Sequence, residues 1–294
     1  MSEAEPNEIA KAFIASCRDE IEAPKPGNVH IFADGHGMTV DHFLRSAEVA
    51  AEPLCRPFST IGDRILGAVE ATALSVGLNT NLGIILLCAP LAAAADFKAA
   101  SPAERAPGQG NQEDEFRQSL KKLLGGLTRE DAQSAFDAIV RAAPAGLGQS
   151  GRHDVRAPAE TTLLDAMKEA ASRDRIAYQY ASDFSDVFTI GANALAAARE
   201  KAWPAPWPVV AVYLSFLAGI FDSHITRKNG LDAALVVQNA AIDIRERFMA
   251  QTDPADSLGD LLDFDRRLKA TGLNPGTSAD LTVATLFADR LILS

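Results

Sequence analysis

The chain has 294 residues, 47% hydrophobic and 23% charged, an ordinary globular composition that allows one large domain or two smaller ones. Its formal net charge of −11 argues against a general nucleic-acid binder and against an anionic membrane surface as partner. Three scattered cysteines, Cys17, Cys55 and Cys88, match neither a disulfide framework nor a zinc knuckle. Reduced thiols, an acidic N-terminus without a signal-peptide pattern and apolar runs shorter than a ~20-residue span predict a cytoplasmic protein with no membrane partner.

Helical patterns follow one another along the chain. Apolar spacings of three and four predict an amphipathic helix over 7–22, which Pro24 and Pro26 end. Polar loops are expected at 98–112 and 143–160, and a Pro-rich hinge at 201–208; loops as long as 143–160 are usually functional or disordered. Further helices are expected at 40–55, 60–77, about 79–97, 113–124, 129–142, 159–173, 174–201 (one helix or two), 208–223, 229–251, 255–270 and 278–293. Because sustained strand-type alternation is absent, the sequence predicts an all-α fold of ten to twelve helices in a single domain, 1–294.

Four polar clusters interrupt this helical pattern, and the first runs from Lys25 to His42. Lys25 could meet a phosphate, and Asp34 and Asp41 could hold a hard cation through their oxygens. The histidines, His36 among them, do not match a standard zinc spacing. The alternative interpretation is a glycine-rich turn between two helices.

The second cluster is the run of polar residues from Asn79 to Asn81, directly before an apolar helix. A helix N-terminus attracts anions through free N–H groups and its dipole, although one of these residues would suffice as a plain N-cap. In the third cluster, Asp222 follows an apolar helix and precedes Arg227 and Lys228. A buried Asp222 would need a partner or a metal, whereas the alternative is an ordinary helix end with favourable cations.

The fourth cluster, from Leu273 to Asp280, marks another helix start. Thr277 and Asp280 have the spacing of a capping box, and the alternative is a second helix N-terminus directed at a ligand. The chain contains no Walker, GxSxG or GxGxxG motif, so P-loop, α/β-hydrolase and Rossmann functions lack support.

Taken in order, these clusters resemble the triphosphoribosyl-dephospho-CoA synthase family over about residues 25–291. The family's KPG-x-V element is similar to KPGNV at 25–29, and its G-x-N-T-H-K-G element to GLNTNLG at 77–83. Its D-T/S element with a following basic residue and glycine resembles 222–230, and its C-terminal PG-x-SADL element resembles 272–281. Asn81-Leu82 replaces the family's His-Lys, the Gly-Ala-His stretch is only loosely matched by 35–42, and the middle segment differs, which indicates a divergent branch.

The resemblance implies that the 2′-hydroxyl of 3′-dephospho-CoA attacks C1 of the ATP ribose and that adenine leaves. Such a glycosyl transfer needs carboxylate charge near an oxocarbenium-like transition state, a base for the hydroxyl and an acid for the base that leaves. ATP, Mg²⁺ and dephospho-CoA are therefore the expected ligands. The residues expected to serve them catalytically are Asp222, Asp41 and His36, with Asp222 and Asp41 also as Mg²⁺ ligands. The expected binding residues are Lys25, Gly27, Asn28, Asn79, Thr80, Asn81, Ser223, Arg227, Lys228, Gly276, Ser278 and Asp280.

Two other functions stay open at this point. The departures from the family pattern favour a related ATP-dependent transferase whose acceptor belongs to one-carbon cofactor biosynthesis, folate- or methanopterin-like. A non-catalytic nucleotide-binding protein is the other alternative, although a dead scaffold would be expected to lose its acids, and Asp41, Asp222 and Asp280 are all present. The sequence leaves the acceptor and the oligomeric state open, a homo-oligomer included.

Overall fold

The computed structural model describes residues 7–100, 111–144, 146–149 and 151–293. These residues form α-helices without any β-strand, which confirms the all-α prediction, and the helix count is slightly above the expected ten to twelve. The helices are α1 (Glu8–Glu22), α2 (Val40–Leu54), α3 (Ile61–Val76), α4 (Leu82–Ala100), α5 (Gln112–Gly125), α6 (Arg129–Ala142), α7 (Leu163–Ala170), α8 (Arg175–Ala181), α9 (Ala192–Glu200), α10 (Trp207–Gly219), α11 (Ser223–Asn229), α12 (Leu231–Ala250), α13 (Leu258–Ala270) and α14 (Gly276–Leu293).

Local capping explains most of the helix boundaries. The side chain of Asn7 accepts a hydrogen bond from the N–H of Ala10 at the start of α1, and Thr60 accepts from Asp63 at the start of α3. Gly77 ends α3 in the left-handed conformation, with φ 71°, which glycine adopts without a Cβ penalty. These polar caps and the glycine are sequence signals, so the predicted 60–77 helix agrees with α3 to within a residue at each end.

Two predicted helices are divided in the structure. The segment 174–201 forms α8, a π-helical turn (Val187–Gly191) and α9. The predicted helix 208–223 ends at Gly219, because Ile220 adopts an extended conformation and Asp222 then caps the separate helix α11. Asp222 therefore begins a helix, whereas the sequence analysis placed it at the end of one.

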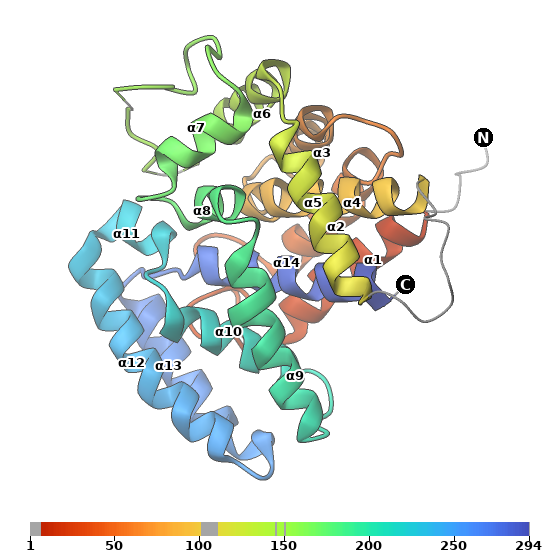
Figure 1. Ribbon diagram of the computed structural model, residues 1–294. Coiled ribbons are helices and arrows are strands. Elements are labelled where there is room, and N and C mark those ends of the chain that lie inside the picture. Colours follow the sequence, from red (N-terminus) through yellow and green to blue (C-terminus); the bar gives the residue numbers. More distant parts are fainter. Residues whose placement is uncertain (1–6, 101–110, 145, 150, 294) are drawn as a thin grey trace.

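The last helix, α14, passes through the middle of the molecule and packs on α1, α4 and α10 (Figure 1). Most of its residues are buried, and α4 and α10 are also apolar on all sides, as expected for helices surrounded by protein. Among the described residues no single helix is long and apolar enough to cross a membrane; only the bent pair α10–α11 reaches that length and composition. This packing brings the N-terminal ends of α4, α11 and α14 towards one region.

Candidate active site

A cavity of about 730 Å³ lies where these helix ends meet the connection between α6 and α7. This volume is within the usual range for small-molecule sites, ~300–1,000 Å³. All four polar clusters of the sequence contribute to its lining. The predicted site residues in the lining are Asn28, His36, Asn79, Thr80, Asn81, Arg227, Lys228, Gly276 and Asp280. Four segments that are far apart in the chain therefore share one cavity.

The run of polar residues before α4 has a divided role. Asn79 accepts a hydrogen bond from the N–H of Leu82 (3.3 Å), as an N-cap does. The hydroxyl of Thr80 lies 2.5 Å from that of Ser46 on α2, and the Asn81 amide donates to Thr72 Oγ1 on α3 (3.2 Å). Asn79 thus caps α4, Thr80 and Asn81 anchor its start to two neighbouring helices, and all three residues line the cavity.

Asp222 joins the N-termini of α11 and α14 through both carboxylate oxygens. Its Oδ1 accepts from the backbone N–H groups of His224 (3.0 Å) and Ile225 (3.2 Å). Its Oδ2 accepts from the backbone N–H (2.8 Å) and the hydroxyl (2.9 Å) of Ser278. Burial raises the pKa of Asp222, and these hydrogen bonds oppose the rise. Neither Asp222 nor Ser278 lines the cavity, so the arrangement gives both a positioning role.

The expected magnesium pair is not brought to the cavity. Asp41 is exposed in the first turn of α2 and, like Asp222, does not line it. Both oxygens of Asp222 are already occupied by protein donors. Within the described part of the chain, no group of three or more Asp, Glu, His or Cys side chains could hold a metal ion. The Mg²⁺-ligand and catalytic roles expected for Asp41 and Asp222 therefore stay predictions without support from this geometry.

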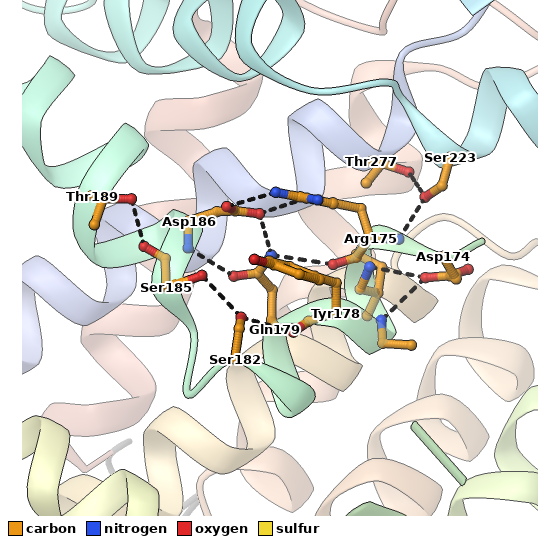
Figure 2. Close-up of polar contacts among 12 residues, drawn as sticks. Asp174, Arg175, Tyr178, Gln179, Ser182, Ser185, Asp186, Thr189, Ser223 and Thr277 are labelled. Atoms are coloured by element: carbon orange, nitrogen blue, oxygen red, sulfur yellow. Dashed lines mark hydrogen bonds and ion pairs between the residues drawn. The ribbon is translucent and has the colours of Figure 1, made fainter. Parts of the chain in front are cut away.

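Ser223, another expected binding residue, also lies outside the cavity lining and belongs to a polar network (Figure 2). Its hydroxyl accepts from the backbone N–H of Arg175 (3.1 Å) and lies 3.0 Å from the hydroxyl of Thr277. The Arg175 guanidinium binds Asp186 through two nitrogens, at 2.7 and 2.8 Å, and Gln179 donates to the same carboxylate. This network fixes the start of α8 against α11 and α14.

The Lys-Pro-Gly-Asn segment, residues 25–28, contributes Asn28 to the cavity lining and keeps its other residues outside it. Lys25 is fully buried and forms an ion pair with Glu20 of α1, and its ammonium also lies 3.3 Å from Asn28 Oδ1. Gly27 has φ +84°, and a Cβ there would lie 2.7 Å from Cδ of Pro275, so this turn requires glycine. Lys25 and Gly27 do not line the cavity, so the expected contact of Lys25 with a phosphate stays a prediction without support from this geometry.

Five acidic residues line the cavity, Glu20, Asp154, Glu169, Asp174 and Asp280, and of these Glu20 and Asp280 belong to the packed helices α1 and α14. Asp280 packs directly against the first turn of α4, because a Cβ added to Gly83 would lie 2.0 Å from Asp280 Oδ2. Burial raises the pKa of Asp280 well above its usual value; the negative charges of Asp222 and Glu20 add to the rise, and Arg227 opposes it. Asp280 thus differs from Asp222 because it lines the cavity and Asp222 does not.

Three histidines also line the cavity: His36, His153 and His224. His36, in the left-handed region with φ 55°, donates from Nε2 to the Gly27 carbonyl (2.9 Å). His224 packs on the start of α14, where a Cβ on Gly276 would lie 3.0 Å from its Nδ1. Burial lowers the pKa of His224 to about 4, and the cations Arg227 and Lys228 reinforce the shift, so this imidazole is neutral at pH 7.

Five basic side chains also line the cavity in this acidic protein: Arg152, Arg156, Arg173, Arg227 and Lys228. Arg227 lies 3.3 Å from Asp174, and Arg152 lies 3.6 Å from Glu169, whereas exposed Lys228 forms no ion pair with a described residue. The sequence analysis missed the first three arginines together with Glu20 and His224. Its one relevant signal was the length of the 143–160 connection.

Buried carboxyl groups, neutral imidazole and basic side chains in one helical cavity define an all-α site suited to a phosphate-bearing substrate. The family model of ATP:dephospho-CoA triphosphoribosyl transferase matches residues 6–293, so the chain belongs to this family of transferases. The crystal structure of a candidate triphosphoribosyl-dephospho-CoA synthase from Archaeoglobus fulgidus has the same fold, with a TM-score of 0.61 and 22% identity over 84% of this chain and 96% of that one. No curated protein sequence matches the chain.

Proposed function

We propose that this cavity transfers the triphosphoribosyl group of ATP to the 2′-hydroxyl of 3′-dephospho-CoA and releases adenine. The family assignment supplies the reaction. The observation that supports the location is that all four polar clusters meet in one cavity. Both substrates are intracellular nucleotides, so the proposal places the protein in the cytoplasm.

The basic side chains would neutralise the phosphate groups of the two substrates. Guanidinium groups suit this role because they stay charged and bind phosphate oxygens in pairs. Mg²⁺ in nucleotide sites is usually held by substrate phosphates and one or two carboxylates, so a cluster of three protein ligands is not required. Asp154 and Asp174, which line the cavity beside these arginines, are the carboxylates that would hold Mg²⁺, and the ion would supply charge neutralisation.

The wall formed by α6–α8 would accept the less polar parts of the substrates. Apolar side chains line it together with the arginines of the same segment: Phe136, Ile139, Val155, Leu163, Met167 and Ile176. An adenine ring or the pantetheine arm of dephospho-CoA would gain from burial against this wall. The cavity therefore offers basic side chains for the phosphates and apolar side chains for the less polar groups.

The test is adenine release, measured by chromatography with purified protein, ATP and Mg²⁺, and with dephospho-CoA present or absent. We expect release that requires dephospho-CoA, a product whose mass is the sum of the substrates minus adenine, and no release with the matched acceptor 2′-deoxy-dephospho-CoA. Thermal protection by ATP without adenine release would contradict this acceptor and favour a one-carbon cofactor precursor. Absence of ATP binding would contradict the proposal as a whole.

A further inference from the structure

Glu20 and Asp280 reach the same cavity from two helices that pack on each other, α1 and α14. Asp280 lies in the first turns of α14, packed against Gly83 at the start of α4, and the charge of Glu20 raises the pKa of Asp280. Glycosyl transfer commonly uses two carboxyl groups, one that gives a proton to the departing group and one that remains ionised. Such a division requires different surroundings for the two groups.

The surroundings of Glu20 and Asp280 differ in this way. Glu20 is in direct contact with the buried ammonium of Lys25, a contact that stabilises the ionised carboxylate. Asp280 has no comparable ion pair or hydrogen bond with another described residue. Burial raises the pKa of both groups, but Lys25 opposes the rise for Glu20, whereas Glu20 and Asp222 increase it for Asp280.

Gly83 holds the Asp280 carboxyl group in its place. It lies in the first turn of α4, one turn from the Asn79–Asn81 run, and leaves no room for a side chain next to Asp280. The groups that act on Asp280 come from several elements: Glu20 on α1, Asp174 before α8, Asp222 before α11 and Arg227 on α11. Only Arg227 is a cation, and it is shared with Asp174. The protonated form of Asp280 is favoured by this balance.

We propose that Asp280 protonates the departing adenine and that Glu20 accepts the proton of the attacking 2′-hydroxyl. This inference rests on the function proposed above. The bond from the hydroxyl oxygen to C1 of the ATP ribose forms as the bond from C1 to adenine N9 breaks, and the electron pair of that bond stays on adenine. Asp280 gives its proton to a ring nitrogen of adenine, and Glu20 takes the hydroxyl proton. Exchange with water then restores both groups.

The test compares two nucleotides in the same variant. Asp280→Asn keeps the shape of the side chain but cannot give the proton; we expect its kcat with ATP to fall roughly 10²–10⁴-fold, the usual contribution of a general acid. With 7-methyladenosine 5′-triphosphate, whose base leaves as a neutral molecule without protonation, we expect the variant to recover to within about tenfold of the unsubstituted protein. ATP affinity, measured by calorimetry, should stay within a few-fold.

Glu20 is tested in the variant Glu20→Gln with Lys25→Met, which removes both charges and leaves no buried ion unpaired. We expect a loss of kcat on the scale of Asp280→Asn and no recovery with the methylated nucleotide. Circular dichroism and ATP protection against heat verify that this variant is folded. A Glu20 variant that recovers like Asp280→Asn would overturn the assignment of the base.

Gly83→Ala tests position without changing a titratable group. We expect at least a tenfold loss of kcat with ATP and partial recovery with the methylated nucleotide, because the added Cβ displaces the Asp280 carboxyl group. Gly259→Ala in the first turn of α13, where nothing lies within 4 Å of an added Cβ, is the matched control and should leave kcat unchanged.

The outcomes separate this inference from the proposed function. No adenine release by the unsubstituted protein would contradict the function itself. An active protein whose Asp280→Asn variant keeps more than a tenth of kcat with ATP, or loses the same fraction with both nucleotides, would overturn the role of Asp280 alone.

Discussion

Asp222 offers a direct test of its positioning role, because it is the acceptor at two helix starts. In Asp222→Ala, the buried backbone N–H groups of Ile225 and Ser278 lose their acceptor, and the N–H of His224 keeps only Thr277 Oγ1. Loss of one N-cap costs about 0.5–2 kcal/mol, and a buried unpaired donor about 1–3 kcal/mol. Two helix ends are affected, and relief of the buried carboxylate offsets part of the cost, so we expect a loss of roughly 3 kcal/mol.

Urea unfolding of the Asp222→Ala variant measures this loss. The matched control is Asp253→Ala, which removes an exposed aspartate that accepts a single hydrogen bond, from the Ala255 N–H, and should cost about 1 kcal/mol. A loss below about 1 kcal/mol for Asp222→Ala would refute the reasoning. If activity then disappeared and returned at high Mg²⁺, Asp222 would instead be the metal ligand that the sequence analysis expected.

Four further predictions concern stability and substrate affinity. The pKa of His224 in the folded protein, about 4, lies below its unfolded value, so its contribution to the free energy of unfolding is complete above pH 6.5 and is lost as the pH falls towards 4. Unfolding measured at pH 7 and 4.5 should show that His224→Gln loses less stability than the unsubstituted protein, by roughly 2–3 kcal/mol. The pKa of Asp280 is raised, so its ionisation in the unfolded chain lowers stability as the pH rises above 3.8, and urea unfolding should show that Asp280→Asn gains stability relative to the unsubstituted protein over that rise. Lys25→Met leaves Glu20 buried without its cation and should cost about 3–5 kcal/mol in urea unfolding, more than the double variant with Glu20→Gln. Lys228→Ala should raise a substrate KM several-fold at low salt and less at high salt, with kcat unchanged, in steady-state kinetics.

Helix boundaries were predictable where the cause is local. Thr60 and Gly77 show this for α3, since a cap side chain and a left-handed glycine act within one turn. The separation of α10 from α11 was not predictable, because the hydrogen bonds that place Asp222 at the start of α11 continue to Ser278, 56 residues later. The break after α8 likewise occurs where tertiary contacts form: the Arg175 guanidinium binds Asp186, and the Arg175 backbone N–H donates to Ser223.

Part of the candidate site could be inferred in the same way. Polar residues at helix starts, such as Asn79 and Asp280, are visible in the sequence and do line the cavity. Whether such a residue faces a ligand or another helix depends on tertiary packing. The sequence analysis therefore expected Lys25 at a phosphate and could not show that it forms an ion pair with Glu20. Glu20 itself lies in the regular pattern of an amphipathic helix, where nothing local distinguishes it from a surface acid.

The central claim is that ATP binds in the cavity between the starts of α4 and α14. Photolabelling with 8-azidoadenosine 5′-triphosphate, followed by mass spectrometry of the digested protein, tests it most directly. We predict that the label is found on peptides that contain cavity-lining residues, 78–84 or 274–280 among them, and that excess ATP suppresses it. ATP-suppressible label confined to a separate cavity, which Val187, Phe188 and Thr285 line, would contradict ATP binding at the starts of α4 and α14.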